Sequence, residues 1–356
     1  MLKGNRGEWS EVYAFLRILA DGEIKPADAN LNELSDEPAI PVIRAIREEK
    51  GAPRVSYYVG DLVRAELDGG ETIAEVETGK LASEAASLYR EITSAGHAKG
   101  AFAVPLTEEF MDELGLHTLK APSADKADIV LQIHDVHTGF SPVCGWSIKS
   151  ELGNPPTLLN AGASTNFVFK LDRCNREIME RANTIDTKNK LKDRIAFLER
   201  SCEFLFERAA HPVFDRNMRL VDSLFPSLMA EAVLRYYSGE GPTCRHIVEG
   251  MERDDALDMG EGMYEYKFKK FLCAVALGMT PAKKWNGRDD ATGGYVVVRD
   301  DGKVLAFHIY NRDMFEDYLL DSTRFETAST SRHNFGCVYE EDGEYFINLN
   351  LQIRFK

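Results

Sequence analysis

The chain has 356 residues, of which 44% are hydrophobic and 28% are charged, as is typical of soluble globular proteins. This length allows one large domain or two of ordinary size with a well-buried core. The longest apolar runs, such as residues 271–279, are far shorter than the roughly 20 residues of a membrane span. Charges interrupt the first apolar stretch, which argues against a secretory signal. We therefore expect a cytoplasmic protein without a membrane partner.

The formal net charge of −15 argues against nucleic-acid binding, because phosphate neutralisation dominates such affinity. The acid is spread unevenly, however. Residues 23–38 and 66–78 hold much of it, whereas residues 281–288 read PAKKWNGR. An acidic protein with a basic cleft is therefore still compatible with the composition. The six cysteines are scattered without a CxxC pair, so neither a zinc ribbon nor a disulfide framework fits.

Apolar spacing near 3.6 residues predicts a helix over residues 7–20, and similar patterns predict helices over 81–94 and 106–115. An acidic loop that contains proline is expected to follow the first helix. Further along, residues 172–210 are expected to be largely helical, as are 216–237, with Pro226 bending or dividing them, and 264–278. Residues 293–310 indicate a β-hairpin about Asp301 and Gly302, and the last strands are expected near the C-terminus.

Between these helices the apolar pattern changes to a period of two. Residues 128–136 (DIVLQIHDV) and 144–150 (CGWSIKS) predict a β-hairpin with a long turn. In the second strand, Trp146 and Ile148 share one face, and Ser147 and Lys149 share the other. Asp128 begins the neighbouring strand, so we expect its carboxylate to meet the Lys149 ammonium at one edge of the sheet.

An Asp and a Lys in this arrangement are suited to phosphodiester hydrolysis. That reaction needs an oxygen-ligated divalent cation, an activated water and positive charge near the attacked phosphate. The competing interpretation is a surface salt bridge between Asp128 and Lys149, which is the more common role of such a pair. No GxxxxGK[ST], GxSxG, HExxH or CxxC motif supports another enzyme class.

Asp128, a hairpin, and then Ser147, Ile148 and Lys149 resemble the signature of PD-(D/E)XK nucleases, in which an Asp precedes a (D/E)xK strand. The stretch 145–169 (GWSIKSELGNPPTLLNAGASTNFVF) is similar to HpaII-type restriction endonucleases, as are residues 5–22 (NRGEWSEVYAFLRILADG) and the ending FINLNLQIRF. The resemblance touches both ends and the middle of the chain. It implies an α/β (α+β) fold with a restriction-endonuclease-like core, a mixed sheet flanked by helices and an additional helical region.

The resemblance also implies a type II restriction endonuclease that cuts double-stranded DNA with Mg²⁺ at a short site, CCGG. Asp128, a second carboxylate, the Ile148 carbonyl and waters would hold the metal, and Lys149 would position or deprotonate the attacking water. Ser147 stands where the family pattern has an acid, and serine is a poor magnesium ligand. Glu11 and Glu8 on the first helix are the leading replacements, although both are also typical of an acidic first turn; Glu84 and Glu151 are alternatives.

Sequence recognition is expected from loops that reach base edges, because arginine pairs well with guanine O6 and N7. Two segments, 157–166 and 323–336, are rich in suitable polar side chains. The expected DNA contacts are Ser150, Asn160, Asn166, Arg324, Ser331, Arg332, His333 and Asn334.

We expect an N-terminal part over residues 1–171 that carries the catalytic hairpin, and residues 172–356 as a helical and β-rich part that contributes to DNA recognition. The expected partners are double-stranded DNA, a cognate DNA methyltransferase encoded nearby and a second copy of the chain, since two-fold DNA symmetry suits a homodimer. Two alternatives stay open. One is a structure-specific or repair nuclease on the same scaffold, and the other is a DNA-binding module whose nuclease site has decayed.

Overall fold

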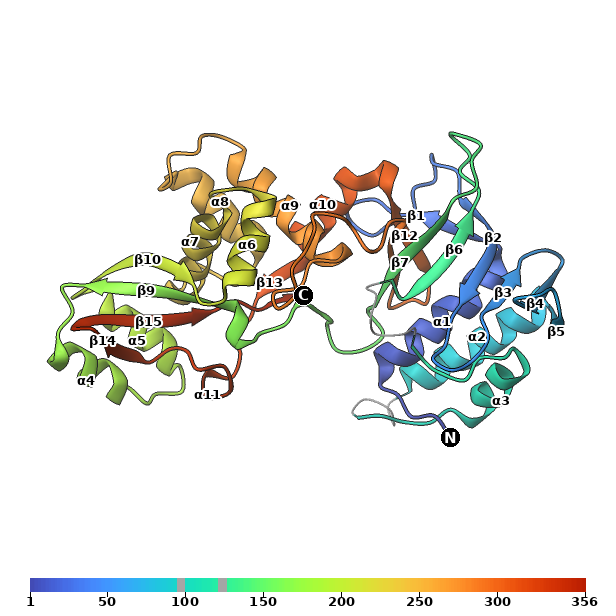
Figure 1. Cartoon of the computed structure of the whole chain (residues 1–356), viewed down its shortest axis with the longest axis horizontal. Helices are drawn as coiled ribbons and strands as arrows, with labels where there is room; N and C mark the ends of the chain where they lie inside the picture. Colours follow the sequence, from blue (N-terminus) through green and yellow to red (C-terminus); the bar gives the residue numbers. More distant parts are fainter. Residues whose placement is uncertain (95–99, 121–126) are drawn as a thin grey trace. The chain divides into compact units, whose positions relative to one another are not determined.

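The computed structural model describes residues 1–94, 100–120 and 127–356. It divides into two compact units, which Figure 1 traces along the chain. Unit 1 comprises residues 1–156 and 289–318, and unit 2 comprises residues 157–288 and 319–356. The first boundary thus lies at residue 156 and not near 171. The chain returns to unit 1 after residue 288 because the hairpin that follows pairs with the strands of that unit.

Unit 1 is built on a mixed nine-stranded sheet with the order β1-β12-β11-β7-β6-β2-β3-β4-β5. Its strands are β1 (Glu23–Pro26), β2 (Ile40–Arg47), β3 (Val55–Tyr58), β4 (Leu62–Leu67), β5 (Thr72–Glu77), β6 (Ile129–Ile133), β7 (Val143–Ser150), β11 (Gly294–Val298) and β12 (Val304–His308). Because β1 pairs with both β12 and β2, six of these strands close into a ring. The predicted hairpin β6–β7 lies in the middle of the sheet.

Helices cover the two faces of this sheet. On one face α1 (Arg6–Asp21) packs against α2 (Thr78–Thr93) and against β7, and Figure 1 shows the two helices side by side. Trp9 and Leu16 of α1 are fully buried in the shared core with Trp146. On the other face Phe315 of α10 (Arg312–Ser322) packs on Tyr295 and Phe307. The short helix α3 (Pro105–Glu113) completes the helices of this unit within the described residues.

Unit 2 combines two small sheets with a group of helices. One sheet has the order β10-β9-β15-β14 and the other β13-β16-β8. The strands are β8 (Thr157–Leu159), β9 (Asn166–Asp172), β10 (Glu203–Ala209), β13 (Thr323–Phe325), β14 (Val338–Glu341), β15 (Glu344–Asn350) and β16 (Ile353–Phe355). The helices are α4 (Arg176–Thr184), α5 (Lys190–Leu198), α6 (Pro212–Val221), α7 (Phe225–Ser238), α8 (Cys244–Asp254), α9 (Met263–Leu277) and α11 (Thr330–His333).

Two sequence-based expectations were wrong in detail. Residues 203–209 form strand β10 and not part of a helix, because Phe204 and Phe206 pack on aromatic side chains of β9 across an antiparallel ladder. The region 23–77 holds strands β1 to β5, where only an acidic loop was expected. Strand β5 illustrates why the sequence did not predict it. Val76 is its one buried side chain, so the strand lacks a strong apolar alternation.

In the part of the chain that is described, no helix is both long enough and apolar enough to cross a membrane. All six cysteines are free thiols. The mixed α/β class is confirmed, and Pro226 occupies the first turn of α7, where it ends the preceding segment and starts a new helix.

Candidate active site

Strand β7 continues beyond the point where β6 stops pairing with it. Ile129, at the start of β6, pairs with Trp146, whereas β11 follows the other edge of β7 as far as the pair of Val298 with Ser150. The edge of β7 that faces β6 is therefore open after Trp146. Because the N–H and C=O of alternate residues project from the same edge of a strand, Ile148 presents both of these groups there.

Asp128 occupies this open edge. Its backbone N–H donates to the Trp146 carbonyl at 2.8 Å. Its carboxylate oxygen Oδ2 accepts a hydrogen bond from the Ile148 N–H at 2.7 Å and another from the Ser147 hydroxyl at 3.2 Å. The other oxygen, Oδ1, has no hydrogen-bond partner among the described residues. Asp128 is thus a carboxylate held rigidly by one oxygen, with the second available to a ligand.

Ser147 has a clear structural task at the position of the usual acid. Its side chain is 2% exposed and donates to Asp128. The hydroxyl therefore orients Asp128 and does not replace a carboxylate ligand. A carboxylate at this position would lie at hydrogen-bond distance from Asp128 and repel its like charge. With serine here, the second carboxylate of the site has to come from another part of the chain.

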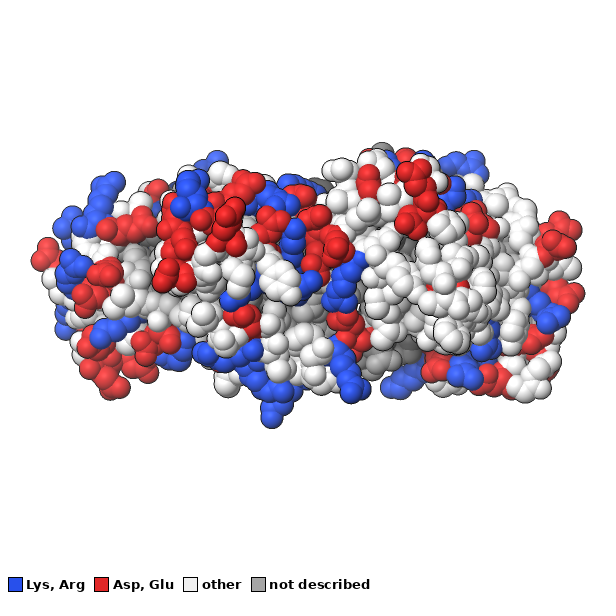
Figure 2. Space-filling view, turned by 90° about the horizontal axis from the view of Figure 1, so that it is seen from above, with Lys and Arg blue, Asp and Glu red and all other residues white. Residues whose placement is uncertain are grey.

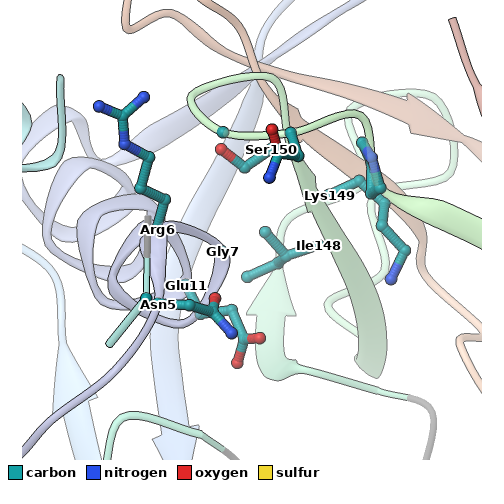
Figure 3. A pocket seen from close by; sticks show the side chains of 11 residues that line it. Asn5, Arg6, Gly7, Glu11, Ile148, Lys149 and Ser150 are labelled. Carbon is teal, nitrogen blue, oxygen red and sulfur yellow. The ribbon is translucent and has the colours of Figure 1, made fainter. Parts of the chain in front are cut away.

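Lys149 lies on the same strand face as Ser147, as the alternation predicts. The ammonium forms no ion pair with Asp128, nor with any other described residue, so the alternative of a surface salt bridge is not what the structure contains. Lys149 is half-buried and lines a pocket together with Glu11 and Ile148. In Figure 3 its side chain leaves the strand on the side away from the Ile148 side chain.

Glu11 on α1 contributes the second carboxylate of this pocket. Figure 3 shows its carboxylate beside the Ile148 side chain, with Asn5 close by. Burial and, second, the negative charge of Asp128 raise the pKa of Glu11 to about 8, against the opposing effects of Lys120 and Lys149. No hydrogen bond or ion pair with a described residue satisfies this carboxylate. A half-buried, unpaired acid near a second acid is an arrangement that a cation stabilises.

Glu8, one turn earlier, is already engaged. Asn5 and Glu8 form a capping box at the start of α1, with Asn5 N–H donating to Glu8 Oε2 at 2.7 Å. Lys120 Nζ lies 2.6 Å from Glu8 Oε1. Burial favours a raised pKa for Glu8, but the hydrogen bonds from Lys120 and Asn5 hold that pKa below its usual value. The alternative Glu151 is exposed and accepts a hydrogen bond from the Asp300 N–H.

The donors at this edge fit a hard divalent cation. Across the ranges that the structure describes, no three His, Cys, Asp or Glu side chains are grouped closely enough to hold a metal ion. Asp128 Oδ1, the Glu11 carboxylate and the Ile148 carbonyl are all oxygen donors, which suits Mg²⁺ with waters completing the shell. The geometry carries this fit, because Asp128 Oδ1 and the Glu11 carboxylate have no hydrogen-bond or ion-pair partner among the described residues; the raised pKa of Glu11, which comes first from burial and then from the charge of Asp128, is consistent with it.

Two residues of the site were not expected from the sequence. Lys120 lies in a region without strong periodicity, and only its ion pair with Glu8 and its effect on Glu11 reveal it. Tyr295 of β11 is fully buried and pairs in register with Ser147, on the same side of the sheet. Its hydroxyl has no hydrogen-bond partner in the described structure. No sequence signal could identify Tyr295, because the parallel pairing of β11 with β7 is a tertiary feature.

The two expected recognition segments come together in unit 2. Asn166 Nδ2 donates to the His333 carbonyl at 2.9 Å, which links the start of β9 to α11. Asn160, Ser331, Arg332 and Asn334 are exposed there, and His333 is half-buried. Arg324 instead lies within strand β13, opposite Arg354 and 3.7 Å from Glu326.

Two of the expected DNA contacts do not fit that role. Asn166 is 3% exposed, and its carbonyl oxygen accepts from Asn350 Nδ2 at 2.7 Å, so both ends of its amide are used inside unit 2. Ser150 hydrogen-bonds Ser10 of α1 at 2.9 Å and also accepts from the Leu152 N–H. The Asn166 amide is occupied by hydrogen bonds inside unit 2 and the Ser150 hydroxyl by hydrogen bonds inside unit 1, which sequence composition does not reveal.

Comparison with known proteins gives one consistent result. The model of a family described as HpaII restriction endonuclease matches residues 5–355 of the chain. The type II restriction enzyme HpaII of Haemophilus parainfluenzae is 38% identical over 357 aligned positions, which cover 99% of this chain and 98% of that protein. No solved structure matches the chain.

Proposed function

The chain belongs to the HpaII restriction endonuclease family, and we propose that it hydrolyses both strands of duplex DNA at CCGG with Mg²⁺, using a PD-(D/E)XK-type core. The observation that carries the proposal is the open edge of β7. There Asp128 is fixed by Ile148 and Ser147, and Lys149 lines the same pocket as Glu11.

Each residue of this edge has a separate task in the proposed reaction. Asp128 Oδ1, Glu11 and the Ile148 carbonyl would hold the cation. When bound, Mg²⁺ polarises the phosphate and lowers the pKa of a bound water. Ser147 keeps Asp128 in one orientation through its hydrogen bond. The ligands therefore need little rearrangement, since the strand backbone and a buried hydroxyl already define their positions.

Lys149 supplies the positive charge at the attacked phosphate. Its ammonium is not neutralised by an ion pair with any described residue, so its full charge is available to the scissile group. In that position it orients the attacking water and stabilises the charge that develops on the phosphate oxygens. No covalent intermediate is needed, because water attacks the phosphorus directly and the leaving 3′ oxygen takes up a proton from solvent.

Site recognition is assigned to unit 2. Arg332, Ser331, Asn334 and Asn160 are the exposed polar side chains of the two segments that Asn166 joins. An arginine reads guanine through O6 and N7, which suits a target made of G·C pairs. A palindromic site is also matched by a two-fold dimer, and protection of the host's own CCGG sites from cleavage would require a cognate methyltransferase.

The experiment that tests the proposal is a plasmid digest. Purified protein is incubated with plasmid DNA with and without Mg²⁺, beside the Lys149→Ala variant. Discrete fragments that map to CCGG, absent without Mg²⁺ and in the variant, are expected. Nicking at branched or mismatched DNA alone would instead support a structure-specific nuclease. Binding without any cleavage by the folded wild-type protein would support a decayed nuclease.

A further inference from the structure

Residues 280–288, which follow α9, form a basic loop in an otherwise acidic chain. The stretch contains no Asp or Glu, and the side chains of Lys283, Lys284 and Arg288 are exposed. None of these three cations forms an ion pair with a described residue. Elsewhere in unit 2, by contrast, Arg235 and Arg245 each bind two or more carboxylates. The loop therefore concentrates positive charge that the protein itself does not use.

A fully buried asparagine holds this loop in place. Asn217 of α6 is 0% exposed. Its Nδ2 donates to the carbonyls of Thr280 at 3.1 Å and Lys283 at 2.8 Å, and its Oδ1 accepts from the Trp285 N–H at 3.0 Å. Every polar group of the amide is satisfied by the loop backbone. The buried asparagine thus fixes both sides of the turn that presents Lys283 and Lys284.

A second set of hydrogen bonds fixes the remainder of the loop. Arg216 donates to the Trp285 carbonyl at 2.7 Å, and Trp285 Nε1 donates to the Arg288 carbonyl at 2.7 Å. The Arg288 N–H in turn donates to Asn286 Oδ1 at 2.9 Å. A solvated run of charges needs no such framework. An ordered backbone lowers the entropic cost of binding a ligand, which indicates that the positions of the cations matter.

The two acids that follow the loop in the sequence do not cancel this charge. Asp289 follows the loop directly, but it accepts from Arg312 at 2.9 Å, so its charge is already compensated. Asp290 is exposed to solvent and forms no ion pair with Lys283, Lys284 or Arg288. The net positive character of the loop is therefore retained at its surface.

We propose that this loop, through Lys283, Lys284 and Arg288, binds the phosphate backbone of duplex DNA. Contacts from lysine and arginine to phosphates supply most of the sequence-independent affinity of DNA-binding proteins and fix their register on the duplex. Lysine acts as a point charge, and the arginine fork can bind two phosphate oxygens. The inference rests on the proposed function, because it assumes that DNA is the substrate. It also explains how a chain of net charge −15 can hold a polyanion.

Salt-dependent binding tests the proposal. The full chain carrying Lys149→Ala, which is expected not to cleave, is titrated against a fluorescent duplex of about 20 base pairs by anisotropy at several KCl concentrations. The same chain with K283Q, K284Q and R288Q added is measured in parallel. Three lost phosphate contacts should make the slope of log K against log salt shallower by about 2 to 3. The affinities for CCGG and scrambled duplexes should fall by similar factors.

A matched control separates the loop from overall charge. K188Q, R200Q and R208Q remove three other exposed cations of unit 2 that have no ion-pair partner among the described residues. This control should keep the parental slope, and melting curves should show that both variants are folded. An unchanged slope in the loop variant, or an equal change in the control, overturns the proposal. If the parental chain binds no duplex and the wild type cuts none, the proposed function itself fails, which is a distinguishable outcome.

Discussion

The catalytic edge of unit 1 and the recognition segments of unit 2 are held together in opposite ways. At the catalytic edge, which comprises Asp128, residues 147–149 and Glu11, the charged side chains of Lys149 and Glu11 line one pocket and form no ion pair with a described residue. In the recognition segments, residues 157–166 and 323–336, the buried amide of Asn166 hydrogen-bonds the His333 carbonyl and the Asn350 side chain. Arg332 and its neighbours then stay exposed.

This difference fits the roles that we propose for the two regions. Phosphodiester hydrolysis benefits from preorganised, uncompensated charge in a site of low dielectric, even though that charge destabilises the fold. Base reading requires side chains that reach outwards from a rigid frame, so the frame carries its hydrogen bonds internally. Substitutions in the two regions should therefore have different effects. Changes at the catalytic edge should affect the rate of cleavage, and changes in the recognition segments should affect binding and specificity.

The largest effect is expected from Glu11→Gln. The substitution removes a carboxylate that no described residue satisfies, so cleavage should fall by at least about a hundredfold, while DNA binding without metal is retained. Single-turnover cleavage and anisotropy with the same duplex measure the two quantities. Asp21→Asn on the same helix is a control, because Asp21 pairs with Arg17 at the far end of α1. Full activity of Glu11→Gln would remove Glu11 from the site.

The same variant also makes a prediction about pH. In the metal-free protein, the pKa of Glu11 is raised from 4.5 to about 8, so the folded state keeps a proton that the unfolded state has lost. The unfolding free energy should therefore decrease as pH rises from about 4.5 to about 8, by at most about 1.4 kcal/mol per pH unit. Urea denaturation in EDTA measures the slope. In Glu11→Gln this contribution should disappear; an identical slope in both proteins would contradict it.

Arg332→Ala should weaken specific binding through the recognition segments. Loss of an arginine that contacts guanine costs about 1–3 kcal/mol for the specific site. Competition binding should show this loss for CCGG and almost none for scrambled duplex. The rate of cleavage of fully bound DNA should change little. A loss that is equal for all sequences would assign Arg332 to the phosphate backbone.

Asn166→Ala should affect the frame of the recognition segments. It removes two hydrogen bonds and leaves the Asn350 amide without one partner, so the unfolding free energy should fall by about 1–3 kcal/mol. Chemical denaturation measures this effect. Asn160→Ala, an exposed position in the same segment, serves as the control and should leave stability unchanged. Equal stability of the two variants would show that the Asn166 amide does not stabilise the contact between the two segments.

Ser147→Ala should give the smallest effect. Asp128 loses the hydrogen bond from the hydroxyl but keeps the stronger one from the Ile148 N–H. We expect a loss of about 1 kcal/mol in stability and a fall in cleavage of roughly tenfold or less, which corresponds to a similar free energy. A loss as large as that of Glu11→Gln would mean that the serine contributes directly to the chemistry.

Much of the catalytic edge could be predicted from the sequence, because the alternating pattern of a strand involves only neighbouring residues. The period of two around Trp146 and Ile148 places Lys149 beside Ser147, and the preceding strand brings Asp128 to the same edge. Long helices such as α1 were equally accessible, because their apolar spacing and the cap at Asn5 are local signals. The two-unit division was not, since it depends on where residues 289–318 pair.

The sequence by itself determined helices such as α1, α2 and α9 and the central hairpin, and its resemblance to a family pointed to DNA cleavage. Only the tertiary structure decided that Ser147 orients Asp128 and that Lys149 is free of an ion pair with the described residues. It also decided that the Asn166 amide forms hydrogen bonds inside unit 2. The physical reason is that hydrophobic periodicity acts over a few residues along the chain. Tertiary partners lie far apart in sequence and meet only when the chain folds. Examples are the ion pair of Lys120 with Glu8 and the pairing of strand β11 with β7.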